Sequence, residues 1–424
     1  MRHTIVIGGG VAGLFAAIAA AEAGDRVTVA ERGRKPLKKL SVTGNGRGNL
    51  LNLGRPVFYG DEAFALAVLE HLPPRQVAGL WERLGVPLVE EDEGRVYPAC
   101  FLASAAVDAL LLRARQLGIT FLTNLRVGAV RKDKTAFQVA GVRTLYAEDT
   151  LRKNGKAKPG AAVGEEVLHL TCDRVILATG GAAAPAHGTD GTAYGLLMGF
   201  GHSLVEPRPA LCALVTEKAP LRGLEGQRAR AALTLYDGAG RKLHSSRGEA
   251  LFAADGVSGI AAMQLARFVA EGCTLHMDLT PAVLGRSADA ASVSRWLADR
   301  CRIRPGLPLR ELLTGAAAPP LGHALLRAAR LPLDGPAETL RPSALETLAR
   351  TMGDFTLEVK GVRGFESAQV TAGGISADGF DPATLESRLC PGLYAAGEVL
   401  NVDGDCGGYN LLFAAASGYL AGRS

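Results

Sequence analysis

Three glycines near the N-terminus have the spacing of a turn that binds phosphate. A β-branched run at 4–7 predicts a strand, and an alanine-rich segment at 14–23 predicts a helix. Between them, Gly8, Gly10 and Gly13 form the pattern G-x-G-x-x-G. The first glycine permits a tight turn, the second lets a pyrophosphate touch the backbone, and the third allows close helix–strand packing. The N–H groups at the start of the helix then face the phosphate oxygens.

Glu31 adds to this prediction because it ends a second predicted strand, 27–30. A carboxylate at this place accepts hydrogen bonds from the ribose hydroxyls of adenosine. The alternative is a surface carboxylate beside Arg32. The chain is therefore expected to bind an adenine dinucleotide, with FAD and NAD both open on these residues alone.

Two further glycine turns follow buried strands later in the chain. The strand 174–177 runs into Ala178-Thr179-Gly180-Gly181, which we expect to close the sheet beside the adenine side. The strand 392–396 runs into Gly397-Glu398. Three such turns are more than one NAD site needs, and they suit a long, bent cofactor whose two halves lie on the two ends of the chain. FAD is therefore the predicted cofactor.

The flavin half is predicted to lie against the C-terminal segment. Gly397, Glu398 and Asp403 are expected to hold the ribityl chain and phosphate. A helix that begins at Gly408 would aim its N–H groups at the flavin N1–C2=O edge, where negative charge collects on reduction. The candidate cofactor-binding residues are Gly8, Gly10, Val11, Ala12, Gly13, Glu31, Arg32, Lys39, Thr43, Gly44, Asn45, Gly46, Asn49, Val127, Ala178, Thr179, Gly180, Gly181, Gly397, Glu398, Asp403, Gly407, Gly408, Tyr409, Asn410 and Leu411.

No residue is assigned as the catalyst. If hydride leaves the flavin for one carbon of a double bond, a general acid must protonate the neighbouring carbon. Tyr409, Cys406 and Tyr97 are candidates for that acid. For Tyr409 we prefer a role in packing against the cofactor or in the structure, and for Cys406 a structural role, although a helix N-terminus lowers the pKa of a thiol. We expect Cys406 to be dispensable.

Composition limits the class of protein. The 424 residues suggest two or three domains, and 48% hydrophobic with 21% charged residues describe a soluble globular protein. No apolar stretch reaches the length of a membrane span, and the N-terminus enters a strand directly, so a cytoplasmic protein is expected. The seven cysteines contain no C-x-x-C pair, which argues against disulfides, a zinc site or a redox dithiol. His187 and Asp190 have no nearby nucleophile, so no metal or triad is predicted.

Basic residues gather in two places. One cluster lies within 32–47, and the other is Arg152 to Lys158. Solvated loops are the simpler interpretation. The sharper one is a surface for phosphates, either of the cofactor, of a nicotinamide donor or of RNA.

The whole chain resembles BaiN-like flavoproteins, also described as NAD(P)/FAD-dependent oxidoreductases or aminoacetone-oxidase-like enzymes. Gly407-Gly408-Tyr409-Asn410-Leu411 with Ser417-Gly418-Tyr419 carries the most specific part of the resemblance. The other motifs are 8–13, 44–47, 178–181, 256–259, 370–375 and 392–418.

The resemblance implies an α/β fold with a Rossmann-like, mainly parallel FAD-binding domain of the glutathione-reductase type. That domain would be discontinuous, from 1–195 and 356–424, with 196–355 inserted (β-rich at 203–280 and helical at 281–350). Residues 33–60 are expected to be a polar loop outside the core. A monomer or weak dimer is expected.

Members of the family are linked to reduction of carbon–carbon double bonds, in steroid-type substrates or in a uridine of ribosomal RNA, and to amine oxidation. The first hypothesis is an FAD-dependent reductase of an activated C=C bond. Because no second G-x-G-x-x-G is visible, NAD(P)H would dock transiently as electron donor, or oxygen would be the acceptor. The alternatives are a flavin oxidase of a small amine or amino-ketone, and a protein that modifies or binds ribosomal RNA.

The chain departs from the family pattern at two places. The family loop reads G-N-G-R-C-N-L-T-N, and here Gly48 replaces the cysteine and Leu51 the threonine. The last helix has small residues at 412–416 where bulkier ones are usual. A smaller lining could enlarge the pocket over the flavin.

Overall fold

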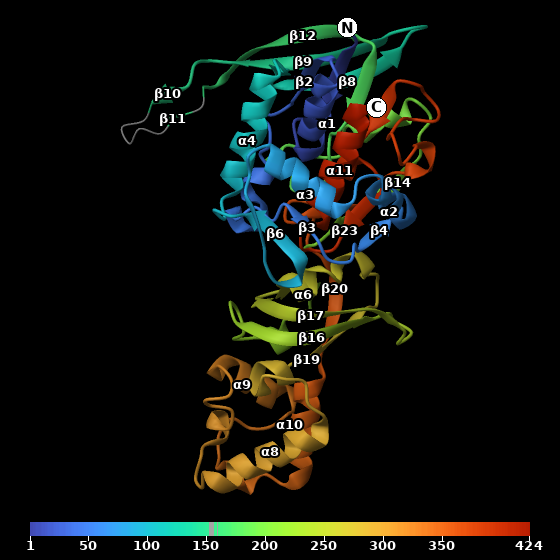
Figure 1. Cartoon of the computed structure of the whole chain (residues 1–424). Coiled ribbons are helices and arrows are strands. Elements are labelled where there is room, and N and C mark those ends of the chain that lie inside the picture. The colour runs from blue at the N-terminus through green and yellow to red at the C-terminus, as the bar shows by residue number, and fades with distance from the viewer. Residues whose placement is uncertain (152–156, 159) are drawn as a thin grey trace. The chain divides into compact units, whose positions relative to one another are not determined.

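The buried strands form one parallel sheet that joins both ends of the chain. Its order is β22 (Leu393–Ala395), β13 (Arg174–Leu177), β1 (His3–Ile7), β2 (Arg26–Ala30) and β7 (Thr120–Leu122) (Figure 1). All four pairings are parallel. Since β1, β13 and β22 are adjacent, the three glycine turns that follow them leave the same edge of the sheet. The predicted Rossmann-type α/β fold is confirmed.

The computed structural model describes residues 1–151, 157–158 and 160–424, without the side chains of 150, 151, 157 and 158. The chain divides into two compact units, Met1–Arg208 with Val370–Ser424, and Pro209–Gln369. The expected bounds at 195 and 356 differ from this division. The reason at the second bound is β20 (Phe355–Val362), whose alternating buried and exposed residues make it an antiparallel strand of the inserted unit.

Helices α1 (Val11–Glu22) and α11 (Tyr409–Arg423) pack side by side in the first unit. The contact depends on glycine, because a Cβ on Gly418 would collide with the carbonyl of Ala12, and one on Gly422 with that of Ala16. The two pairs have the same offset along the sequence, so the helices run parallel. Both N-termini therefore point the same way.

Shorter elements complete this unit. One of them is the antiparallel sheet β12-β9-β8. The remaining elements are β3 (Leu51–Asn52), β4 (Phe58–Gly60), α2 (Glu62–His71), α3 (Pro74–Arg83), β5 (Leu88–Glu90), β6 (Arg95–Pro98), α4 (Ala103–Gln116), β8 (Leu125–Lys132), β9 (Phe137–Tyr146), β10 (Thr150–Leu151), β11 (Ala157–Lys158), β12 (Ala162–Cys172), α5 (Tyr194–Met198), β14 (Leu204–Ala210), β21 (Val370–Ile375) and β23 (Val402–Gly404).

The prediction that residues 33–60 lie outside the core is wrong. Leu37, Leu40, Leu50, Leu51 and Phe58 are buried in the main core cluster. They are scattered among polar and glycine residues, so no helical or strand period reveals them. The loop is held by its apolar side chains while its glycines form turns between them.

The second unit combines a barrel with helices. The barrel order is β15 (Leu214–Thr216), β18 (Gly256–Ser258), β17 (Lys242–Ala253), β16 (Arg228–Tyr236), β19 (Thr274–Asp278) and β20, and the sheet closes on itself. Its helices are α6 (Ile260–Met263), α7 (Thr280–Leu284), α8 (Ala290–Ile303), α9 (Pro319–Ala328) and α10 (Pro342–Gly353).

Two predicted absences can be compared with the described part of the chain. None of its helices is long and apolar enough to cross a membrane. All seven cysteines are free, five of them buried, with Cys406 half-buried and Cys100 exposed.

Candidate flavin site at the glycine turns

The first glycine turn has the geometry that its spacing predicts. Gly8 has φ +110°, and a Cβ there would meet the Ala178 carbonyl, so β1 and β13 approach closely after their last residues. A Cβ on Gly13 would collide with the Gly8 carbonyl. At Gly10, which precedes α1, a Cβ would meet nothing within 4 Å. The open space at Gly10 lies where a phosphate is expected to touch the backbone.

Glu31 is buried, with 9% of its surface exposed, so it is not the surface carboxylate of the alternative interpretation. Its Oε2 accepts a hydrogen bond from Gly9 N at 2.7 Å, and its Oε1 accepts one from Gly33 N at 2.5 Å. Burial raises the pKa of this carboxyl, against the two backbone hydrogen bonds. Each oxygen keeps a second lone pair that can accept a ribose hydroxyl. Arg32 is paired with Asp190 at 2.7 Å.

The loop of Thr43, Gly44, Asn45, Gly46 and Asn49 folds into consecutive left-handed turns. Gly44 and Asn45 have φ +60° and +55°, and Gly46 has φ +84°. Such runs turn successive backbone N–H groups into a concavity that favours anions. A Cβ on Gly44 would lie 3.1 Å from Asn49 N, so the loop closes tightly on itself.

The second and third turns are tied together by Thr371, which was not among the predicted site residues. Its Oγ1 accepts hydrogen bonds from Ala182 N and Ala183 N at 2.8 and 3.0 Å. Its own N–H donates to Glu398 Oε1, and Glu398 Oε2 pairs with Lys39 Nζ, both at 2.8 Å. Two predicted cofactor ligands, Lys39 and Glu398, therefore bind each other and fix the turn.

The start of α11 is held by two asparagines. Asn52 Nδ2 donates to the Gly407 carbonyl at 2.9 Å. Asn410 Oδ1 accepts from Gly404 N, and its Nδ2 donates back to Gly404 O, both at 2.8 Å. Gly408, with φ +105°, precedes the helix without a side-chain cap. The first N–H groups of the helix, from Tyr409 to Leu411, have no acceptor within the helix.

Polar atoms without partners lie in two of these turns and in α5. Within the described residues, Thr179 Oγ1, Asn49 Oδ1 and Tyr194 Oη are buried and make no hydrogen bond. A buried polar atom without a partner costs free energy, so such atoms point to a missing group. Together with the uncapped helix starts, the unpartnered atoms of Thr179, Asn49 and Tyr194 fit a long polar cofactor with phosphates. Of the other predicted site residues, Val127 lies in β8 and Asp403 is buried in β23.

The offset between the two parallel helices fits the same cofactor. Because Gly418 lies beside Ala12, α11 begins eight residues ahead of α1. At the rise of an α-helix, this offset separates the two helix starts by about 12 Å along their axes. One N-terminus can therefore face a pyrophosphate while the other faces a group further along the same molecule.

The candidates for proton donor lie at the start of α11. Burial is the main cause that raises the pKa of both Tyr409 and Cys406, and the charges of Asp405 and Glu93 add to it. Burial thus raises the Cys406 pKa, the direction opposite to the lowering that a helix start would give. Both groups are protonated near neutral pH. Tyr97 instead stacks with the Arg47 guanidinium, 4.6 Å from its ring centroid.

The sequence analysis did not identify three residues that position the site, which are Asn52, Thr371 and Ser417. Asn52 is the last asparagine of the family loop, and Thr371 lies in the motif 370–375, so both had a signal. Ser417, fully buried in α11, accepts a hydrogen bond from Gly397 N at 3.0 Å. Its place in the motif 417–419 was the only signal.

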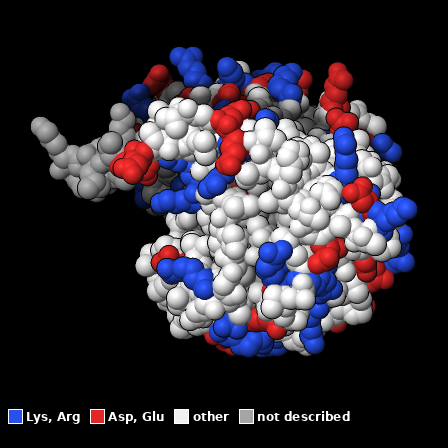
Figure 2. Space-filling model, turned by 90° about the horizontal axis from the view of Figure 1, so that it is seen from above, with Lys and Arg blue, Asp and Glu red and all other residues white. Residues whose placement is uncertain are grey.

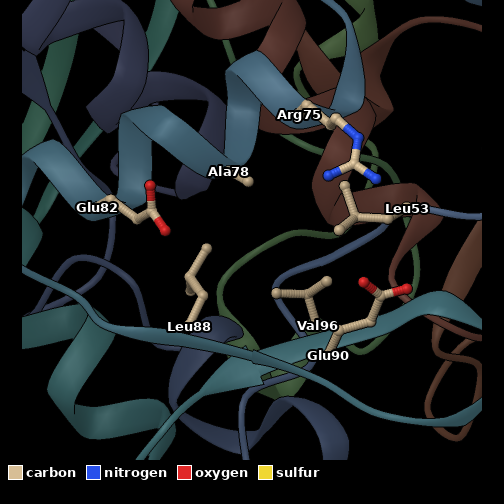
Figure 3. Close-up of a pocket in the computed structure, with 7 residues that line it drawn as sticks. All are labelled: Leu53, Arg75, Ala78, Glu82, Leu88, Glu90 and Val96. Atoms are coloured by element: carbon tan, nitrogen blue, oxygen red, sulfur yellow. The ribbon is translucent and has the colours of Figure 1, made fainter.

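A separate pocket of about 260 Å³ lies between α3 and the sheet β3-β6-β5 (Figure 3). It is lined by Leu53, Arg75, Ala78, Glu82, Leu88, Glu90 and Val96. None of the predicted site residues lines it. The described residues contain no group of histidine, cysteine and carboxylate side chains that could hold a metal ion. His187 and Asp190 form no such site.

The fold is of the Rossmann type, and the family to which the chain belongs is one of FAD-dependent oxidoreductases. The chain belongs to the HI0933-like family, since the model of the HI0933-like protein Rossmann domain matches residues 2–424. The resemblance stated from its motifs is thereby confirmed.

Two relatives match over nearly the full length. The chain is 33% identical to the 3-dehydro-bile acid delta(4,6)-reductase of Clostridium scindens, covering 100% of this chain and 99% of the relative. It is 27% identical to the ribosomal RNA dihydrouridine synthase of Escherichia coli, over 98% and 96% of the two chains. Among solved structures, it is similar to 3-ketosteroid delta1-dehydrogenase from Sterolibacterium denitrificans, with a TM-score of 0.49, 14% identity and coverage of 100% and 99%.

Proposed function

We propose that the protein reduces an activated C=C bond of a small molecule with electrons from NAD(P)H, through FAD. The observation that carries the proposal concerns the parallel helices α1 and α11 of the first unit. Neither helix start is capped by a side chain, and the two starts are offset along the helix axes. The names of the two relatives support the reaction type, because a delta(4,6)-reductase and a dihydrouridine synthase both saturate a carbon–carbon double bond.

The proposed cofactor contacts follow the chain from one helix start to the other. Gly10 to Gly13 would bind the pyrophosphate, and Glu31 the adenosine ribose. The loop 43–49 and the turn 178–181 would line the cofactor between them. Gly407 to Leu411 would face the flavin with backbone N–H groups. When bound, FAD supplies hydride transfer.

Tyr409 is the proposed proton donor. It lies in the first turn of α11, and its raised pKa keeps the phenol protonated. Replacing Tyr409 by Phe should reduce turnover about 100-fold, the usual contribution of a general acid, and leave FAD content unchanged. Cys406→Ser is expected to keep both FAD content and turnover. Normal flavin content without turnover in Cys406→Ser would show that the thiol is catalytic.

The test of the reaction is anaerobic and uses two steps. NADH or NADPH should reduce the flavin, so that its absorbance at about 450 nm decreases. A steroid with a 3-oxo group and double bonds at positions 4 and 6 should then restore it and be recovered with a saturated bond. No bleaching by either nucleotide, together with peroxide formation from a small amine, would favour an oxidase instead.

The charges of the first basic cluster favour a small-molecule substrate over RNA. Arg32, Arg34, Lys39 and Arg47 are paired with Asp190, Asp149, Glu398 and Glu91, and Lys38 donates to the Ala186 carbonyl. Figure 2 shows basic and acidic side chains interspersed on the face seen from above. Arg152 to Lys158 lie outside the residues whose side chains are described. RNA binding would appear as an affinity that falls steeply with salt.

A further inference from the structure

Arg95 lies beside the start of α11, and most of its N–H groups donate to no described residue. It opens strand β6, and its Nε lies 3.8 Å from the point that a Cβ on Gly407 would occupy. Asn52 Nδ2 and Tyr409 Cε2 lie 3.5 and 3.7 Å from that same point. The guanidinium, the amide and the aromatic ring therefore surround one glycine, immediately before the helix.

The guanidinium has few partners inside the protein. Its Nη2 pairs with Glu93, and the described residues offer it no other hydrogen bond. An arginine side chain has five N–H donors, so most of them remain for a ligand. Glu93 is 73% exposed, and such exposed pairs contribute little. Lys39 differs, because it is bound to Glu398, whose side chain is 19% exposed.

The backbone that presents Arg95 is strained. Glu93 has φ +62° and Gly94 has φ +72°, two left-handed residues in succession directly before Arg95. A left-handed backbone is unfavourable for a non-glycine residue and persists where the surroundings impose it. Here Asn52 imposes it by donating to the Glu93 carbonyl at 3.1 Å while holding Gly407. Asn52 thus connects the turn at Glu93 and Gly94, which precedes Arg95, to the start of α11.

We infer that Arg95 binds the carbonyl oxygen of an α,β-unsaturated carbonyl substrate, beside Tyr409. This inference rests on the proposed function and names the group that activates the double bond. Bound FAD, reduced by NAD(P)H, would supply the hydride that adds to the β-carbon, and the electron pair of the double bond would shift to the carbonyl oxygen as an enolate. Arg95 stabilises that negative charge. The α-carbon then takes the proton of Tyr409, which regains one from water.

The test separates the two half-reactions in the FAD-loaded full-length protein. The variants are Arg95→Met and Arg95→Lys, with Arg131→Met at an exposed arginine of strand β8 as matched control. Reduction by NAD(P)H and reoxidation by oxygen should match the unmodified protein in every variant. Reoxidation by a neutral α,β-unsaturated ketone should slow about 100-fold or more in Arg95→Met, the usual loss on removal of one donor to a developing oxyanion. Arg95→Lys should retain part of the rate, since it keeps the charge without the planar fork.

Three results would overturn the assignment. Unchanged reoxidation by the ketone in Arg95→Met would remove Arg95 from the substrate site. Loss of FAD from that variant would make Arg95 a cofactor-site residue. A defect with a carboxylate-bearing steroid but not with the neutral ketone would show that Arg95 binds a carboxylate. If the unmodified protein is not reoxidised by any unsaturated ketone, the proposed function fails and the inference fails with it.

Discussion

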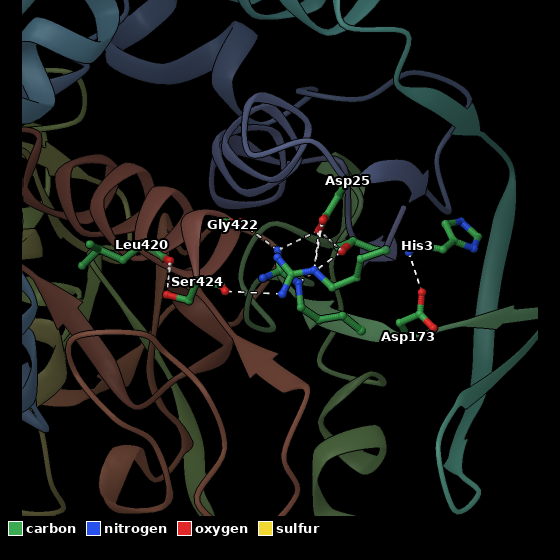
Figure 4. A network of polar contacts seen from close by, with 9 residues as sticks. His3, Asp25, Asp173, Leu420, Gly422 and Ser424 are labelled. Atoms are coloured by element: carbon green, nitrogen blue, oxygen red, sulfur yellow. Dashed lines mark hydrogen bonds and ion pairs between the residues drawn. The ribbon is translucent and has the colours of Figure 1, made fainter.

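The two ends of the packed helices α1 and α11 are built in opposite ways. At their C-terminal ends, Arg174 is 1% exposed and donates from Nη2 to the Gly422 carbonyl at 2.8 Å and from Nε to Thr4 Oγ1 at 3.1 Å. Thr4 in turn donates to Asp25 Oδ2 at 2.6 Å. Asp25, Gly422 and Ser424 converge at this end (Figure 4). Most of the charge and hydrogen bonds there are exchanged within the protein, although Arg174 Nη1 is buried without a hydrogen-bond partner among the described residues.

At their N-terminal ends the same helices present donors that the chain does not use. Neither Gly10 nor Gly408 caps its helix with a side chain, and Thr179 Oγ1 and Asn49 Oδ1 have no partner in the described residues. One end thus supplies stability, and the other keeps polar groups for a ligand. Substitutions at the two ends should separate stability from cofactor binding.

Arg174→Met should give the largest loss of stability. Removing the buried guanidinium leaves the Gly422 carbonyl without its donor and Asp25 with Arg2 as its remaining cation, so the free energy of unfolding should fall by about 4 kcal/mol. Denaturant unfolding of the flavin-free protein measures it. Arg113→Met, which breaks the exposed pair with Glu22, is the control and should cost less than about 1 kcal/mol. Equal losses in the two variants would contradict the contrast between the ends.

Gly13→Ala should come next, with a loss of about 3 kcal/mol from overpacking. Its Cβ would collide with the Gly8 carbonyl, so the helix and the turn must separate. FAD affinity should fall as well, because the turn itself moves. A variant that keeps both stability and FAD affinity would show that the close packing of α1 on the turn is not required.

Much of this site could be predicted because its parts are local. Gly8 to Gly13 and the strands around them are contiguous patterns, and each folded as expected. The missed residues act across long separations. Thr371 joins the turn at Ala182 to Glu398, and nothing near Thr371 in sequence indicates that contact. Asn52 reaches Gly407 in the same way.

Burial within the loop 33–60 was missed for another physical reason. Its apolar residues do not repeat at intervals of two or of 3.6, so they carry no periodic signal. They become core only when the glycines between them take left-handed conformations, which a composition rich in glycine and asparagine does not reveal. The charge pairs that occupy the first basic cluster are likewise visible only in three dimensions.

Gly48→Cys tests whether the family residue can return to this loop. Gly48 has φ +78°, and a Cβ there would lie 2.9 Å from Ala103 Cα. The left-handed backbone alone disfavours a side chain by roughly 1–2 kcal/mol, so a loss of about 2 kcal/mol is expected. Thermal unfolding with and without FAD measures it. A stable variant would mean that the loop and α4 adjust easily.

Gly10→Ala should have the smallest effect on stability and a clear effect on cofactor binding. Nothing lies within 4 Å of the added Cβ, and φ is −80°, so the flavin-free protein should lose less than about 1 kcal/mol. The same methyl group occupies the space at the first N–H groups of α1, where a phosphate would touch the backbone. FAD affinity, measured by flavin fluorescence on titration, should therefore fall at least about tenfold, or about 1.4 kcal/mol. Gly353→Ala in α10, which also adds a methyl group to open space at a residue without a left-handed φ, is the control and should leave FAD affinity unchanged. If FAD binds Gly10→Ala as tightly as the unmodified protein, the N-terminal end of α1 does not hold the phosphates, and the contrast between the two ends loses its functional meaning.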